Sequence, residues 1–223
     1  MKILIFDSGP LINLSMNGLL DILEKLKKIS NSKLIITSQV QKEVYDRPVM
    51  IRQFELGALR IHELIEKNIL ELPESLSISS NLLNSKTQEL LALANHFLKT
   101  EEQWIQIVSE AEMSCLALAV ELKKQGHDVL VAIDERTARM LSEKPENLEE
   151  IMSSRLHKKV KIQGNLNELK NIKIIRSSEL VYVAYKNNLV GLKDSKSLEA
   201  LIYATKYKGA AISWDEINVL KKL

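Results

Sequence analysis

Cysteine, glycine, proline and aromatic residues are all scarce in this chain of 223 residues. Cys115 is the only cysteine, which excludes an internal disulfide and a zinc site built from several cysteines. No apolar run approaches the roughly 20 residues that a membrane-spanning helix needs, and the charged first helix has no secretory-signal pattern. These absences predict a soluble protein in the reducing cytoplasm, with no membrane partner.

An excess of one charge sign is also lacking. The 31 Lys and Arg residues nearly balance 29 Asp and Glu residues, giving a formal net charge of +2. This balance excludes the strong overall basic field of many duplex-DNA-binding proteins, so any contact with nucleic acid must use a local patch. The four histidines show no metal-ligand spacing, and no nucleophilic triad of Ser, His and Asp is evident. A metal ion held by carboxylates removes the need for such a nucleophile, so this absence is consistent with a carboxylate site.

Acidic residues occur where apolar runs end and helices are expected to begin. They are Asp7 after KILIF, Glu43 after LIITSQVQK, Glu110 and Glu112 in SEAEMSCLALA, and Asp134 after DVLVAI. Because the carboxyl ends of parallel strands share one edge of an open α/β sheet, carboxylates far apart in sequence can meet there. Convergent carboxylates predict a site for Mg²⁺ or Mn²⁺, which needs only one or two direct carboxylates because it keeps several waters.

Strand and helix patterns alternate along the chain, which predicts an α/β protein with a central parallel sheet in a three-layer α/β/α sandwich. A helix after Asp7 should bury Ile12 and Met16, and Ser38 should cap the next helix. Residues 74–86 indicate a mobile loop or a connection between helices, and VKI at 160–162 is the expected closing strand of the sheet. Residues 1–165 should form the main domain, with a C-terminal α/β extension at 166–223 packed on it.

Four of these segments together resemble the PIN-domain ribonucleases, a family that includes toxins of toxin–antitoxin pairs and archaeal relatives. IFDSGPLINL is similar to the opening strand with its first aspartate, and ITSQVQKEV to the second acidic position. SEAEMSCLALA and IDERTAR are similar to the third and fourth. The resemblance covers about residues 1–163.

The resemblance implies metal-dependent hydrolysis of RNA. Asp7 and Asp134 would be the inner ligands of Mg²⁺ or Mn²⁺, with Glu110 or Glu112 as a further ligand. Glu43 would orient water or a second ion. The family also implies an RNA substrate, an antitoxin-like protein partner and a homodimer.

A second alignment of the same pattern stays open. Glu199 lies in an alanine-rich helical segment and Asp215 follows the short run AAIS, so these two could replace Glu112 and Asp134. We favour Asp134 because VLVAID is the longer buried-strand candidate and because VKI can follow it as the closing strand.

Each acidic position also has a structural explanation. Asp7 could cap a helix, Glu43 could pair with Arg47, and Ser109 with Glu112 has the spacing of a capping box. Arg136 and Arg139 could contact phosphate or lie on the surface. The C-terminal segment interleaves aromatic and basic residues that could stack on bases and contact phosphates, or could instead form core: Tyr182, Tyr185, Lys186, Tyr203, Lys206, Tyr207 and Lys208.

Two other functions compete with the ribonuclease hypothesis. One is a non-catalytic RNA-binding or assembly module that keeps the fold. The other is a phosphatase of the haloacid-dehalogenase type, because IFDSG also opens a parallel sheet with an aspartate. That class has a second acid two residues later, where this chain has Gly9, so we rank it last.

Overall fold

The computed structural model describes residues 1–192 and 194–222, and its centre is a five-stranded sheet. The strand order is β3-β2-β1-β5-β7, and every pairing is parallel. The strands are β1 (Lys2–Phe6), β2 (Ser32–Ile36), β3 (Leu70–Glu71), β5 (Asp128–Ala132) and β7 (Lys173–Ile175). The predicted α/β class and central parallel sheet are therefore confirmed.

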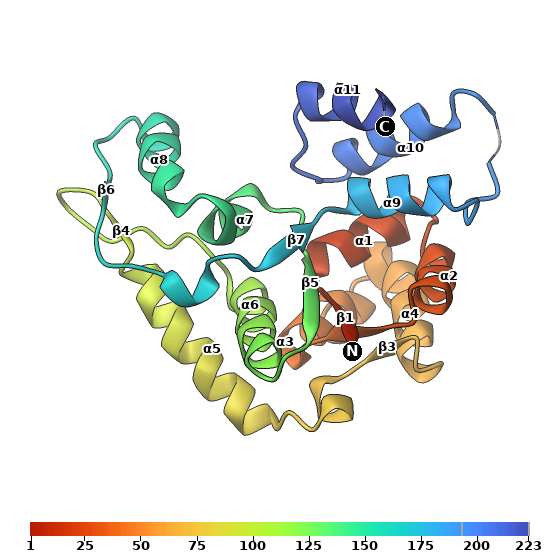
Figure 1. Ribbon diagram of the computed structural model, residues 1–223, viewed down its shortest axis with the longest axis horizontal. Coiled ribbons are helices and arrows are strands. Elements are labelled where there is room, and N and C mark those ends of the chain that lie inside the picture. Colours follow the sequence, from red (N-terminus) through yellow and green to blue (C-terminus); the bar gives the residue numbers. More distant parts are fainter. Residues whose placement is uncertain (193, 223) are drawn as a thin grey trace.

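Helices cover both sides of the central strands (Figure 1). On one side α6 (Glu110–Lys124) contacts β1 and β5, and α5 (Ser80–Asn95) and α3 (Ser38–Gln41) pack against α6. On the other side lie α1 (Ser8–Met16), α2 (Asp21–Ser30), α4 (Arg52–Glu66) and α9 (Ser177–Lys186). This arrangement is compatible with a three-layer α/β/α sandwich.

The core forms because the inner strands are apolar on both faces. Ile3, Ile5 and Phe6 of β1 are buried, as are Val129 and Val131 of β5. Strands covered by helices on both sides need such continuous apolar sequences. Because β1 and β5 are parallel neighbours, Asp7 and Asp134, which follow these strands, lie at one edge of the sheet.

The first helical region differs from the predicted one. It is two helices, because α1 ends at Met16 and Gly18 has a positive φ of 69°. The buried stripe is also shifted, since Ile12 is 38% exposed whereas Asn13 is fully buried. The packing of α1 against α4 and α9 turns Asn13 inward, whereas the spacing of apolar residues had predicted that Ile12 would face the core.

The predicted loop or helix connection at 74–86 is correct only for residues 74–79, because the rest of the segment belongs to a helix. A 3₁₀ turn spans Pro73–Leu76, and α5 begins at Ser80 with the Ser79 side chain accepting a hydrogen bond from the Leu82 amide. The serine and asparagine residues that indicated a loop therefore include a helix cap.

The prediction that VKI closes the sheet is also wrong. Lys161–Ile162 forms β6, which pairs antiparallel with β4 (Leu98–Lys99) in a separate two-stranded sheet. This small sheet and α8 (Leu148–Leu156) project beside α7 (Arg136–Glu143) in Figure 1, and we call them the arm. The closing strand is β7, which lies within the segment assigned by sequence to the C-terminal extension.

The C-terminal helices α10 (Ser197–Tyr207) and α11 (Trp214–Lys222) enclose a small apolar cluster of Ile202, Ile212 and Ile217. The segment between them runs along the end of β5, where the Ala211 amide donates to the carbonyl of Asp134 at 3.0 Å. None of the described helices has the length and apolar character required to cross a membrane.

Candidate functional site

Asp7 and Asp134 are the two buried acids at the carboxyl edge of the sheet. Asp7 is only 4% exposed and directly precedes α1. One of its carboxylate oxygens, Oδ2, accepts a long hydrogen bond of 3.4 Å from the Gly9 amide. The other oxygen, Oδ1, is buried without a hydrogen-bond partner. Burial, assisted by the nearby negative charges of Glu112 and Glu43, raises the pKa of Asp7 to about 7.

Asp134 lies beside Asp7 across Gly9. A Cβ atom added to Gly9 would sit 3.5 Å from the Asp134 Cβ and 3.5 Å from Asp7 Oδ2. The two aspartates follow neighbouring strands, because β1 and β5 are paired from Lys2 with Asp128 to Phe6 with Ala132. The sheet edge thus brings together the two residues expected to be the inner ligands.

Three donors hold the carboxylate of Asp134. The Ser177 amide donates to Oδ1 and the Ser177 hydroxyl to Oδ2, both at 2.8 Å, and Asn13 Nδ2 donates to Oδ2 at 3.3 Å. Burial raises the pKa of Asp134, and these hydrogen bonds together with the charge of Arg176 oppose that shift.

Sequence reasoning missed both Ser177 and Asn13. Ser177 follows β7, so its position at the same sheet edge would have indicated it if β7 had been identified as the closing strand. Asn13 gave a weaker signal. It is a polar residue on the helix after the first acidic position, and the Asn13 amide also donates to the Thr205 carbonyl at 2.8 Å.

Glu43 lies in a single π-helical turn, Lys42–Asp46, that continues α3. Its Oε2 accepts a hydrogen bond of 2.7 Å from the Ser8 hydroxyl. Ser8 therefore orients the carboxylate of Glu43. The predicted helix cap at Ser38 is wrong, because the cap is Thr37, whose side chain accepts a hydrogen bond from the Val40 amide. Single π-helical turns of this kind are common at functional sites.

Glu112 forms the capping box suggested by its spacing. Its Oε2 accepts from the Ser109 amide at 2.7 Å, and its own amide donates to Ser109 Oγ at 3.2 Å. Burial raises the pKa of Glu112, and the Ser109 hydrogen bonds lower it. Glu112 also lines a cleft of about 320 Å³ with Glu135, Thr137, Met152 and Arg155.

Glu110 and the alternative pair lie in other surroundings. Glu110 is exposed and accepts from Gln88 Nε2 on α5 at 3.0 Å. Glu199 on α10 pairs with Lys221 on α11 at 2.6 Å, and Asp215 is exposed in the first turn of α11. It is Asp134, rather than either of these, that adjoins Gly9 and Asp7.

The predicted ligands Asp7, Glu110, Glu112 and Asp134 do not form a ready-made cage. Among residues 1–192 and 194–222, no three His, Cys, Asp or Glu side chains are grouped closely enough to hold a metal ion. Three of these carboxylates have donors of their own, since Glu110 accepts from Gln88, Glu112 from Ser109 and Asp134 from Ser177. Asp7 Oδ1 is the buried oxygen that has none.

The predicted phosphate and base contacts lie on the other side of α7. Arg136 and Arg139 line a cavity of about 560 Å³ together with Lys206 and Tyr207, and Arg139 donates to the Ala211 carbonyl at 3.2 Å. Lys206 also lies 4.7 Å from the ring centre of Trp214. Much of the aromatic cluster thus makes contacts within the C-terminal helices.

No protein-family model matches this chain, and neither the curated proteins nor the solved structures gave a match. The PIN-domain resemblance therefore remains a prediction from sequence.

Proposed function

We propose that this chain is a divalent-metal-dependent endoribonuclease, and that Asp7 is its central acidic residue. The observation that carries the proposal is Asp7 itself, buried at the carboxyl edge of a parallel sheet with an unpartnered oxygen and a pKa raised to about 7. A buried carboxylate oxygen with no donor is costly unless something else satisfies it, so such a residue is a functional-site candidate.

The side chains around Asp7 fit an Mg²⁺ or Mn²⁺ ion that retains most of its waters, because one or two direct carboxylates are then enough. Asp7 and Asp134 would hold the ion, with Glu112 and Glu43 near enough to influence the charge of Asp7. A bound ion of this kind activates water and stabilises the leaving oxygen in phosphodiester cleavage. Ser177 and Asn13 keep Asp134 oriented, and Ser8 keeps Glu43 oriented.

A non-catalytic RNA-binding or assembly module is the second candidate. It is favoured by the lack of a preassembled group of three ligands among the described residues. An antitoxin-like protein partner and a homodimer remain predictions from the family resemblance.

Cleavage of a fluorescently labelled single-stranded RNA, with and without Mn²⁺, tests the proposal. We expect metal-dependent cleavage that Asp7→Asn and Asp134→Asn abolish, and Mn²⁺ binding in calorimetry that both variants weaken. Glu199→Gln and Asp215→Asn are the matched controls and should cleave normally. Loss of cleavage in these controls but not in Asp134→Asn would support the second alignment. RNA binding without cleavage in the unaltered protein would support the non-catalytic module.

A further inference from the structure

Two lysines face each other across the small sheet of the arm. Lys99 of β4 is the direct antiparallel partner of Lys161 of β6, so both side chains leave the same face of the sheet. Like charges directly opposite each other destabilise a strand pair. The nearby ion pair joins Lys158 to Glu102 instead, at 2.8 Å. The arm thus bears a local cost that a bound anion would relieve.

An exposed tryptophan continues this row of cations. Trp104 forms an antiparallel bridge with Lys99, and Lys99 Nζ lies 5.1 Å from the centre of the indole ring. Trp104 is 41% exposed, and His96 meets its ring edge-on at 5.0 Å. A partly exposed indole therefore lies beside Lys99, next to the lysine pair.

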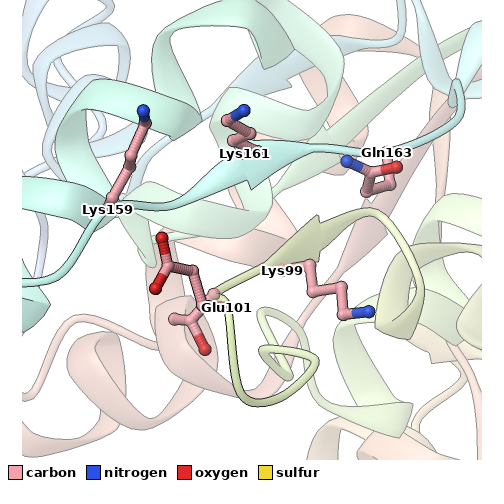
Figure 2. Close-up of a pocket in the computed structure, with 6 residues that line it drawn as sticks. Lys99, Glu101, Lys159, Lys161 and Gln163 are labelled. Carbon is pink, nitrogen blue, oxygen red and sulfur yellow. The ribbon is translucent and has the colours of Figure 1, made fainter.

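The same region is hollowed into a shallow cavity of about 200 Å³. Figure 2 shows Lys159, Lys161 and Gln163 along the β6 segment, with Lys99 and Glu101 on the neighbouring β4 segment. Three of these side chains are cationic and only Glu101 is acidic. The cavity is thus a local basic patch in a chain whose overall charge is almost neutral.

We infer that Lys99, Lys159, Lys161 and Trp104, which we call the lysine–tryptophan face, bind single-stranded RNA. The ammonium groups contact phosphates and the indole stacks on a base, which is the combination that single-stranded nucleic acid requires. An acidic protein segment would use the lysines but would gain little from the indole. The inference rests on the proposed ribonuclease function, for which this face would bind the substrate.

The chain path connects this face to the acidic site. Ser109 is five positions after Trp104 in the chain, so their Cα atoms are at most about 18 Å apart. Ser109 lines the cleft that contains Glu112, and Arg155 of α8 lines the same cleft. A strand of a few nucleotides on the lysine–tryptophan face can therefore extend along Arg155 toward the acidic residues.

Fluorescence anisotropy with a labelled 12-nucleotide RNA, in EDTA so that no cleavage occurs, tests the inference. Lys99→Gln, Lys159→Gln and Lys161→Gln combined should weaken binding about tenfold or more and lower the slope of log K against log salt by about 2. Trp104→Ala should weaken binding about fivefold or more, and Trp104→Phe much less. The matched control, Lys28→Gln with Lys67→Gln and Lys173→Gln, removes the same charge from other surfaces and should bind almost normally.

A second readout separates RNA from a generic polyanion. In a Trp214→Phe background, Trp104 is the remaining tryptophan, and oligouridylate should quench its fluorescence whereas heparin should not. The inference is overturned if the triple variant binds RNA as well as the control triple variant, or if Trp104→Ala has no effect. RNA binding through this face without any cleavage would support the inference and reject the proposed function. Cleavage that the triple variant leaves unchanged would support the proposed function and reject the inference.

Discussion

Ser177 holds both carboxylate oxygens of Asp134, its amide donating to Oδ1 and its hydroxyl to Oδ2 at the same distance of 2.8 Å. The two residues follow neighbouring strands, β5 and β7, so the pairing of these strands fixes the orientation of the carboxylate. A buried acid that is held in this way cannot rotate freely. Its position is therefore determined by the sheet and by α9 together.

Replacing Ser177 by alanine tests this relationship. We expect Ser177→Ala to lower the free energy of unfolding by about 2 kcal/mol, because a hydrogen bond to a charged group is lost in a buried place. The loss should be larger at pH 8 than at pH 5, since the hydroxyl stabilises the ionised form of Asp134 and its removal raises the pKa further. Urea denaturation at both pH values measures the difference.

Ser178 supplies the control for this substitution. It is the next residue of the same helix, and its buried hydroxyl has no hydrogen-bond partner. Ser178→Ala should therefore leave the stability unchanged or raise it slightly. Equal losses for the two variants would show that the hydrogen bonds to Asp134 contribute nothing.

The raised pKa of Asp7 predicts a pH-dependent gain in stability for Asp7→Asn in EDTA. In the unfolded chain the carboxyl ionises near 3.8, whereas in the folded protein its pKa is about 7. The unfolded state therefore loses its proton first, and the wild-type protein loses stability as pH rises from about 4 to 7. The variant has no such loss, so its advantage should grow to about 4 kcal/mol at pH 7 and stay constant above it.

Thermal unfolding of the wild-type protein and of Asp7→Asn between pH 4 and 8 tests whether the stability advantage of the variant grows with pH. Asparagine keeps the shape of the side chain and can still accept from the Gly9 amide, so the cap survives. The exposed Asp215 is the comparison position, and Asp215→Asn should give no comparable gain. An advantage of Asp7→Asn that shrinks with rising pH would contradict the burial of the charge.

Gly9 separates stability from ion binding. A Cβ at this position would be in ordinary contact with Asp134 and Asp7, so Gly9→Ala should fold and gain about 0.5 kcal/mol from its reduced chain entropy. The same methyl group would lie against Asp7 Oδ2 and the Asp134 Cβ, where it would crowd an ion held by the two residues, and we expect weaker Mn²⁺ binding in calorimetry. Gly57→Ala is the contrasting variant, because its Cβ would be 3.1 Å from Ser15 Oγ and should bring no gain.

Arg176 joins the C-terminal helices to the sheet. It is 6% exposed and bonds to Glu179, to Glu216 of α11 and to the Ala211 carbonyl. Arg176→Ala should lower the free energy of unfolding by about 3 kcal/mol, since it breaks a buried charged network. Urea denaturation measures this loss, and limited proteolysis should show earlier cleavage around α10 and α11. Lys28→Ala, at an exposed pair with Glu24, should leave the midpoint unchanged.

The inner strands β1 and β5, and the positions of the two aspartates that follow them, could be predicted from the sequence. β1 and β5 are apolar on both faces, as strands of a parallel sheet covered on both sides must be, and Asp7 and Asp134 follow these runs. The closing strand was not predictable in the same way. VKI and KII have almost the same composition, and only the long-range pairing of KII with β5 decides between them.

The partners of the acidic residues were harder to predict for a related reason. Asn13 approaches Asp134 because α1 is rotated by its packing against α4 and α9, and no local pattern encodes that rotation. The capping box of Ser109 and Glu112 was predictable because its spacing is local. Local chemistry is thus visible in the sequence, whereas contacts between elements depend on packing.

The two-stranded sheet of the arm has a consequence for the motion of the protein. Two strands alone are marginally stable in water, and the facing charges of Lys99 and Lys161 weaken this pair further. Added salt screens that repulsion but also weakens the exposed pair of Lys158 with Glu102, so in a Lys158→Gln background, which lacks this pair, the arm should open less often as ionic strength rises. Amide hydrogen exchange of Gln163, whose amide donates to the Phe97 carbonyl across the two segments, would then slow in salt, so the opening of the arm would depend on its ionic surroundings.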